Sequence, residues 1–210
     1  MADDLIFYTN PMSRGRIIRW MLEEVGAPYE TRLLDYAGAM KGDDYRSVNP
    51  MGKVPAIVHN GHVVTECAAI CAYLADAFPD AGLAPPLDER ADYYRWLFFA
   101  AGPVEQAVTN RALGFAIEGD QERMAGYGNY DLTVDVLERA VSRSDYIAGD
   151  SFTAADVYAG SQVAWGVQFK TLPMREAFTA YLDRILTRDA YRRATEIDDT
   201  LLAKEAAPAG

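Results

Sequence analysis

The chain is 210 residues long, half of its residues are hydrophobic and 24% are charged. This length suits one large domain or two small ones and is enough to bury a core. Thirty-one acidic against twenty basic residues give a net charge of −11. That balance argues against partners that need a basic surface, such as nucleic acid or an anionic membrane. A small anionic substrate remains compatible with it if a local basic pocket exists.

Three features predict a cytoplasmic protein. No apolar run approaches the roughly 18 to 20 residues that span a bilayer. The start, Met1 to Asp4, is acidic where a signal peptide needs a positively charged segment. The two cysteines, Cys67 and Cys71, lie four residues apart in a helical pattern, so they do not form a disulfide framework of the kind that secreted domains use.

The first eighty residues contain the strand signals. Residues 5–8 are a short apolar run that ends in a turn sequence, and 29–34 form a weaker strand pattern. Residues 56–58 and 62–65 flank Asn60-Gly61. Asn-Gly is the dipeptide that most strongly predicts a tight hairpin, because both of its residues tolerate positive φ.

Helix signals separate and follow these strands. Apolar residues recur at helical spacing from Arg16 to Val25, with Arg19 and Glu23 predicted as an i,i+4 pair on the other side of the helix. A second helical pattern runs from Glu66 to Phe78. The order is β-α-β, an intermediate segment, a hairpin and a closing helix. This order predicts a mixed α/β sheet with helices packed on its faces, over residues 1–80.

Beyond a breaker-rich linker at 79–87, no strand signal is found. We therefore expect an all-helical second domain over residues 88–205. Its helical patterns cover 88–111, 122–141, 154–167, 175–187 and 189–197.

One helix start in this region carries a capping box. Thr153 is placed to cap the helix, and Asp156 to reach back from the third position. Phe152 and Val157 stand where a hydrophobic staple would form. We interpret this pattern as a folding device without a catalytic role.

The stretch between Pro50 and Leu74 has the parts of a site for a charged, peptide-like ligand. Pro55 precedes a strand; a cis bond there would present the backbone of Val54 to an extended ligand, whereas an ordinary trans proline is the plainer alternative. At the next helix start, backbone N–H groups and Cys67 could hold a carboxylate, and Glu66 an ammonium group. Alternatively, Glu66 only complements the helix dipole, or Cys67 is a redox thiol.

The loop after the first strand supplies candidate hydroxyls. Ser13, near a helix start, or Tyr8, at the strand end, could donate a hydrogen bond that favours a thiolate over a thiol. Ser13 could equally be a helix cap, and Tyr8 a core residue.

In combination, these residues resemble the cytosolic glutathione S-transferase family. The resemblance covers nearly the whole chain, and the order and spacing of its motifs carry it. The motifs are the strand-loop-helix from Tyr8 to Gly26, the Asn49-Pro50-x-Gly52-Lys53-Val54-Pro55 loop, the Glu66-Cys67 turn and the Thr153 to Asp156 box. The family implies an N-terminal thioredoxin-like domain with a mixed four-stranded sheet, an all-α C-terminal domain and a homodimer.

The resemblance also implies roles for individual residues. Val54, before a cis Pro55, would pair with the cysteinyl backbone of glutathione, and Lys53 would approach its glycyl carboxylate. Glu66 and Cys67 would hold the γ-glutamyl group. Cys67 departs from the family's usual serine, and a thiol is a weaker donor than a hydroxyl.

The catalytic hydroxyl is the less settled assignment, because family subgroups use tyrosine, serine or cysteine in the first loop. Counting back from Gly26 favours Ser13, with Tyr8 second. The acceptor substrate would lie between the domains, against apolar and aromatic side chains. The candidates are Met12, Phe99, Phe115, Tyr127 and Trp165.

We therefore expect a transferase that uses glutathione as co-substrate against an electrophilic small molecule, without a metal. Two alternatives keep the same site. One is a glutathione-dependent isomerase, dehalogenase or ether-cleaving enzyme. The other is a glutathione-binding or regulatory protein with little activity, since a fold does not determine a function.

Overall fold

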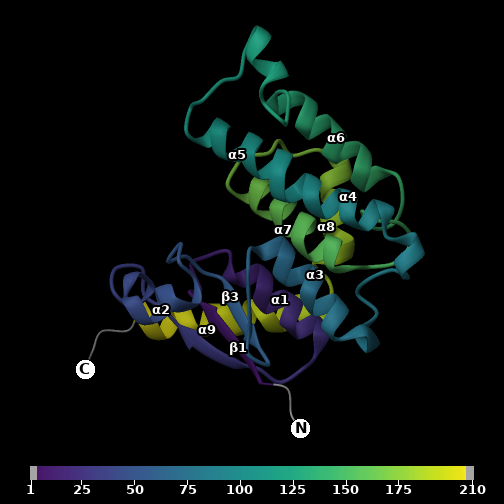
Figure 1. The fold of residues 1–210 in the computed structure, drawn as a ribbon. Helices are drawn as coiled ribbons and strands as arrows, with labels where there is room; N and C mark the ends of the chain where they lie inside the picture. Colours follow the sequence, from purple (N-terminus) through teal and green to yellow (C-terminus); the bar gives the residue numbers. More distant parts are fainter. Residues whose placement is uncertain (1–3, 207–210) are drawn as a thin grey trace. The chain divides into compact units, whose positions relative to one another are not determined.

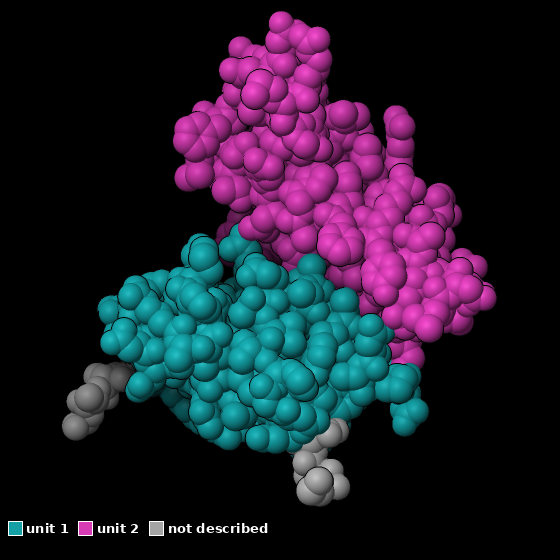
Figure 2. Space-filling model, in the orientation of Figure 1, with its two compact units in different colours: residues 1–81, 188–210 teal, residues 82–187 magenta. Residues whose placement is uncertain are grey.

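The computed structural model describes residues 4–206. The acidic start used in the signal-peptide prediction therefore lies, except for Asp4, outside the described residues. The chain forms two compact units: residues up to 81 together with those from 188, and residues 82–187 (Figure 2). The sequence predicts a break near residue 80 but groups the last helix with the second domain. In the structure that helix is part of the first unit, because it packs on the first helix of the chain.

The first unit is built on a mixed sheet of four strands (Figure 1). The order is β2-β1-β3-β4; β1 is parallel to β2 and antiparallel to β3, which is antiparallel to β4. The mixed sheet predicted from the sequence is therefore confirmed. The strands are β1 (Leu5–Thr9), β2 (Glu30–Leu33), β3 (Ala56–His59) and β4 (His62–Thr65).

The helices of this unit are α1 (Gly15–Val25), α2 (Asp43–Val48), α3 (Cys67–Ala77) and α9 (Asp189–Ala206). Helix α1 ends where Gly26 adopts a left-handed φ of 72°, a conformation that glycine takes without strain. The short helix α2 lies in the segment that the sequence left unassigned.

The two faces of the sheet carry different helices. Successive side chains of a strand point to opposite faces, and β1 follows this rule. The Phe7 ring lies 5.1 Å from the guanidinium of Arg19 on α1. The Tyr8 ring lies 5.3 Å from the Tyr45 ring on α2, in a cluster with Met40. The end of β1 is thus buried between α1 on one face and α2 on the other.

The second unit consists of helices and short turns, without a strand among its described residues apart from the bridge pair Tyr146 and Gly149. Its helices are α4 (Ala91–Phe99), α5 (Glu105–Ala112), α6 (Tyr130–Ser142), α7 (Ala154–Gln168) and α8 (Glu176–Ile185). A π-helical segment, Ala100–Val104, contains Pro103 and joins α4 to α5. Helix α6 begins at Tyr130 rather than at the predicted 122, because Asn129 caps it by accepting a bond from the Leu132 N–H.

The predicted capping box of α7 is confirmed. Thr153 accepts from the Ala155 N–H, and the Asp156 carboxylate accepts from the Thr153 N–H at 2.9 Å. Asp156 is fully buried and also accepts from the Ile147 N–H and the Tyr181 hydroxyl. Burial raises the pKa of Asp156 despite these donors. The carboxylate ties the start of α7 to α8 and serves the fold.

Candidate functional site

The strand register brings three connecting segments to one edge of the sheet. Tyr8 pairs with Ala56, and Ala56 pairs with Thr65. The loop after β1, the turn before β3 and the start of α3 after β4 therefore meet at the same edge. These are the three segments in which the sequence placed the candidate site residues.

The turn before β3 is held by its own hydrogen bonds. The Val54–Pro55 peptide bond is cis, which confirms the sequence expectation. The carbonyl oxygen of Lys53 accepts from the Tyr45 hydroxyl at 2.6 Å and from Asn49 Nδ2 at 2.7 Å. The Lys53 side chain is exposed. Its backbone is therefore fixed, while its ammonium group faces solvent and is able to meet an anion.

The start of α3 combines an exposed acid with a buried thiol. Glu66 precedes the helix with φ 65° and ψ 119°, a conformation that costs a non-glycine residue roughly 1 to 3 kcal/mol and is found chiefly at functional sites. Its side chain is exposed. Cys67 is buried, and its Sγ lies 3.8 Å from the Arg14 carbonyl oxygen in the loop after β1. The first turn of a helix has N–H groups without intrahelical acceptors, so this end suits a carboxylate.

Cys71 does not belong to the site. It is fully buried one turn after Cys67, and burial raises the pKa of its thiol well above the ordinary value. Neither Cys67 nor Cys71 forms a disulfide. Cys71 is therefore a core residue.

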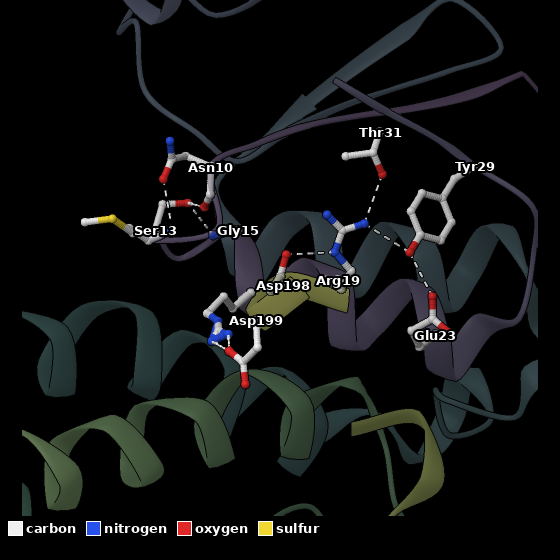
Figure 3. A network of polar contacts seen from close by, with 11 residues as sticks. Asn10, Ser13, Gly15, Arg19, Glu23, Tyr29, Thr31, Asp198 and Asp199 are labelled. Carbon is white, nitrogen blue, oxygen red and sulfur yellow. Dashed lines mark hydrogen bonds and ion pairs between the residues drawn. The ribbon is translucent and has the colours of Figure 1, made fainter. Parts of the chain in front are cut away.

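The loop after β1 is a compact turn centred on Ser13 (Figure 3). Ser13 Oγ donates to the Asn10 carbonyl oxygen at 2.7 Å and accepts from the Gly15 N–H at 2.9 Å. Asn10 in turn accepts from the Met12 N–H and donates to the Leu34 carbonyl oxygen, both at 2.9 Å. The Ser13 hydroxyl is therefore held at the start of α1, half-buried, by groups on either side.

Tyr8 lies elsewhere. Its side chain is on the α2 face, and its hydroxyl accepts from Arg32 Nη1 of β2 at 3.1 Å. The guanidinium of Arg32 also lies 5.6 Å from the Tyr8 ring. The structure therefore does not bring the hydroxyls of Ser13 and Tyr8 together. Arg32 was not among the candidate residues named from the sequence. The signal that could have found it is its place on the strand, two residues after Glu30, which puts its side chain on the same face as Tyr8.

The predicted substrate-contacting residues fall in both units. Met12 is 70% exposed in the first unit. In the second unit, Phe115 and the buried Tyr127 line a cavity of about 530 Å³ together with Arg111. Trp165 is half-buried on α7 and does not line that cavity. The structure thus brings Phe115 and Tyr127 together.

The first unit also contains a buried ion pair that was not predicted from the sequence. Arg19 is 1% exposed, and its Nε donates to Asp198 of α9 at 3.0 Å. The predicted i,i+4 pair of Arg19 with Glu23 is therefore wrong: Glu23 instead accepts from the Tyr29 hydroxyl and from Arg193. Arg19 stands between apolar residues of α1, a position that signals burial, but its partner lies 179 residues away in the sequence.

Two further properties concern residues 4–206. No helix in this part of the chain combines the length and apolar character needed to cross a membrane. Within the same residues, histidine, cysteine and acidic side chains form no group of three or more that could hold a metal ion.

Comparison with known proteins places this geometry in a family. The model described as "Glutathione S-transferase, N-terminal domain" matches residues 12–77. "Glutathione S-transferase 3" of Zea mays is 31% identical over 169 residues, which cover 72% of this chain and 73% of the relative. "Glutathione S-transferase GstA" of Escherichia coli O157:H7 is 29% identical over 78% of this chain and 79% of its own length.

Solved structures agree over more of the chain. A glutathione transferase of Methylococcus capsulatus is 26% identical with a TM-score of 0.76, over 93% of this chain and 99% of the other. A sphingomonad glutathione S-transferase complexed with glutathione is 27% identical with a TM-score of 0.75, over 92% and 98% of the two chains. The first unit thus has the thioredoxin-like fold, followed by a helical unit, and the chain belongs to the glutathione S-transferase family.

Proposed function

We propose that this protein is a glutathione transferase that binds glutathione at the edge of its sheet and activates the thiol for attack on an electrophilic small molecule. The observation that carries the proposal is the register Tyr8–Ala56–Thr65, which gathers the Ser13 loop, the Pro55 turn and the start of α3 at one edge. This arrangement brings together what glutathione requires: backbone groups to pair with a peptide, opposite charges for its two ends, and a hydroxyl for its thiol.

Recognition of glutathione follows from its charges. The γ-glutamyl carboxylate binds the N–H groups at the start of α3, including that of Cys67, and the ammonium group beside it binds the exposed Glu66 carboxylate. The main chain of Val54 pairs with the cysteinyl residue as a neighbouring strand would. The exposed ammonium group of Lys53 meets the glycyl carboxylate.

We assign activation of the glutathione thiol to the Ser13 hydroxyl. The Gly15 N–H polarises the Ser13 hydroxyl, because a hydroxyl that accepts a hydrogen bond becomes a better donor. Rotation of the hydroxyl away from the Asn10 carbonyl directs its proton to the sulfur of glutathione. This bond stabilises the thiolate and lowers the thiol pKa. The thiol proton leaves to solvent, the thiolate attacks the electrophilic carbon, and the leaving group departs with the bonding electrons.

The acceptor substrate is assigned to apolar contacts. We propose that Met12, Phe115, Tyr127 and Trp165 supply them, with support from the cavity that Phe115 and Tyr127 share. The alternative reactions, isomerisation, dehalogenation and ether cleavage, would start from the same thiolate. A weakly active binding protein would use the same recognition groups. The named relatives support the transferase, and none of these alternatives is favoured over it.

Assembly and location complete the proposal. A homodimer is supported by an exposed aromatic face on α4, where Tyr94 and Phe98 stand one turn apart and are 41% and 72% exposed. Cys67 and Cys71 are thiols rather than members of a disulfide, which supports a cytoplasmic location. Light scattering after size exclusion measures the mass; a dimer that dissociates in Phe98→Glu is the expected result.

Thermal unfolding with and without glutathione tests the proposal. A ligand that binds the native state alone, at 100 times its Kd, stabilises by about 2.7 kcal/mol, which raises the Tm of a chain this size by roughly 5 to 10 °C. Glu66→Ala should lose most of this shift. Glu89→Ala, which removes an exposed acid of the second unit, should retain it. No shift in the wild-type protein would remove the proposed function.

A further inference from the structure

Four ion pairs join α1 to the C-terminal segment in one consistent antiparallel order. Figure 3 shows one of them, Arg19 with Asp198. Arg16 near the start of α1 pairs with Asp199 just past the middle of α9, and the last pair joins the end of α1 to the residue before α9. The pairs are Arg16–Asp199, Arg19–Asp198, Glu23–Arg193 and Glu24–Arg188.

The signs of these charges define the register of the two helices. Helix α1 carries its cations in its first half and its anions in its second, and the C-terminal segment carries cations first and anions later. If α9 were shifted along α1 or ran in the other direction, like charges would lie opposite each other, which would destabilise the contact. Only the observed arrangement pairs all four, and the two pairs nearest Gly15, Arg16–Asp199 and Arg19–Asp198, fix the start of α1 on α9.

One of the four pairs is fully buried. The side chains of Arg19 and Asp198 are 2% and 1% exposed. Arg19 also donates to the Tyr29 hydroxyl at 3.2 Å and to Thr31 Oγ1 at 2.9 Å, which ties α1 and α9 to the strand β2. Among the described residues, Arg19 Nη2 and Asp198 Oδ2 lack hydrogen-bond partners. Each charge therefore depends on the other, because a buried charge that loses its partner is strongly destabilising.

The groups facing Asp198 define its titration. Burial raises the pKa of Asp198, while Arg19 and Arg16 oppose this shift and Asp199 adds to it. On the far side of Arg19, burial raises the pKa of Tyr29 to about 12, so its hydroxyl stays protonated and bridges Arg19 and Glu23.

The position of α1 on α9 also determines the position of the Ser13 hydroxyl, the proposed catalytic group. The Gly15 N–H, immediately before Arg16, holds Ser13 Oγ. The contact beneath is tight: a Cβ added to Gly15 would lie 1.9 Å from Thr9 Oγ1. Helix α1 therefore cannot move along its axis or rotate without displacing the hydroxyl that Gly15 holds.

We propose that Arg19 and Asp198 are positioning residues for the reaction, which set α1 against α9 and thereby hold the Ser13 hydroxyl where it stabilises the thiolate of glutathione. This inference rests on the proposed function. The C-terminal helix, outside the matched residues 12–77, becomes part of the machinery that positions the hydroxyl. A displacement of about 1 Å remote from the chemistry is able to reduce a rate roughly 100-fold.

The test compares Asp198→Asn with Glu24→Gln. Both are amide substitutions that remove one anion from the same helix contact, and Glu24 is also nearly buried, but it pairs at the end of α1 far from Gly15. The measurement is the pH profile of kcat/KM for glutathione with an aromatic electrophile, alongside the Tm of each variant. Asp198→Asn should lower kcat/KM about 10-fold at neutral pH and raise the apparent pKa of the profile by about one unit, because less thiolate forms.

The control decides between positioning and stability. Glu24→Gln should lower the Tm and leave the apparent pKa of the profile at the wild-type value. A wild-type profile in Asp198→Asn, or an equal shift in Glu24→Gln, would overturn the proposal. If the wild-type protein shows neither a thermal shift nor turnover with glutathione, the proposed function itself fails.

A second pair of variants covers the case in which Asp198→Asn does not fold. Arg16 and Asp199 are 26% and 59% exposed, so both positions accept a changed charge. Asp199→Arg alone should raise the apparent pKa of the profile, and Arg16→Asp combined with Asp199→Arg should restore it. Two results would contradict the assignment. Either Asp199→Arg alone leaves the pH profile unshifted, or it shifts the profile and the double variant does not restore it.

Discussion

Ser13 and Tyr8 occupy different surroundings although both lie near the end of β1. The period of two along a strand puts Tyr8 on the α2 face, where Arg32 donates to its hydroxyl. Ser13 follows the strand and turns into α1, where Gly15 donates to its oxygen. The sequence could name both hydroxyls as candidates. It could not separate them, because the choice depends on which helix covers which face of the sheet.

Gly15→Ala tests the packing at this loop. The added methyl group would meet the buried Thr9 hydroxyl, so α1 has to shift, and we expect a loss of about 1 to 3 kcal/mol in the free energy of unfolding. Gly102→Ala is the matched control, since a Cβ there meets nothing within 4 Å. Urea unfolding compares the two; equal stability of both variants would contradict the tight contact.

Cys67→Ser tests the residue that departs from the family pattern. A hydroxyl is a stronger donor than a thiol, and one added hydrogen bond of about 1 kcal/mol tightens binding about fivefold. Isothermal titration with glutathione should therefore show higher affinity for the variant. Cys71→Ser, in the closed core, is the control and should lower stability without tightening binding. Weaker binding by Cys67→Ser would remove Cys67 from the γ-glutamyl site.

At the level of elements, local signals predicted most of the structure. The strands of the hairpin, α1, α3 and the capped start of α7 follow from periodicity, from Asn60-Gly61 and from the Thr153 to Asp156 box. Helix α2 was missed because its six residues are too few for a clear period. The start of α6 was predicted too early, since helical spacing of apolar residues continues through a turn that Asn129 ends.

Asp156→Ala should be among the most damaging single substitutions in the second unit. It leaves the Thr153 N–H, the Ile147 N–H and the Tyr181 hydroxyl buried without their acceptor. Each such donor costs about 1 to 3 kcal/mol, so we expect a loss of about 3 to 5 kcal/mol. Chemical unfolding measures it, with the exposed Asp150→Ala as control. A loss below about 1 kcal/mol would contradict the role of the box.

Asp35 stabilises the turn before Ala39–Lys41 in a pH-dependent manner. Backbone N–H groups of Ala39 and Gly38 donate to its carboxylate and hold its pKa below the ordinary 3.8. A lowered folded-state pKa means that the contribution is complete above 3.8 and is lost as the pH falls through the folded value. The stability gap between wild type and Asp35→Asn should be constant near neutral pH and close in acid. A gap that widens in acid, measured by urea unfolding at each pH, would reverse the assignment.

At the scale of the whole molecule, residues 82–187 form the second unit, and the helix that follows them, α9, belongs to the first. Helix α9 lies on α1 (Figure 1). Between them, charges of opposite sign face each other along the contact. Sequence patterns predicted a helix there but not where it packs. Its apolar period is weak, and the buried pair of Arg19 with Asp198 joins residues from opposite ends of the chain. Such a contact is invisible to local periodicity, which explains why the predicted domain boundary grouped α9 with its sequence neighbours.

Ser13 is the residue on which the proposed activation of glutathione depends. The direct measurement is kcat/KM for conjugation of glutathione to an aromatic electrophile in Ser13→Ala and Tyr8→Phe, with glutathione binding of each variant checked by thermal shift. Loss of a hydrogen bond to the thiolate should reduce the Ser13→Ala rate roughly 10- to 100-fold. Tyr8→Phe, which loses a bond to Arg32 on the other face, should fall less than about threefold. A larger fall in Tyr8→Phe than in Ser13→Ala, with binding retained in both, would contradict the assignment.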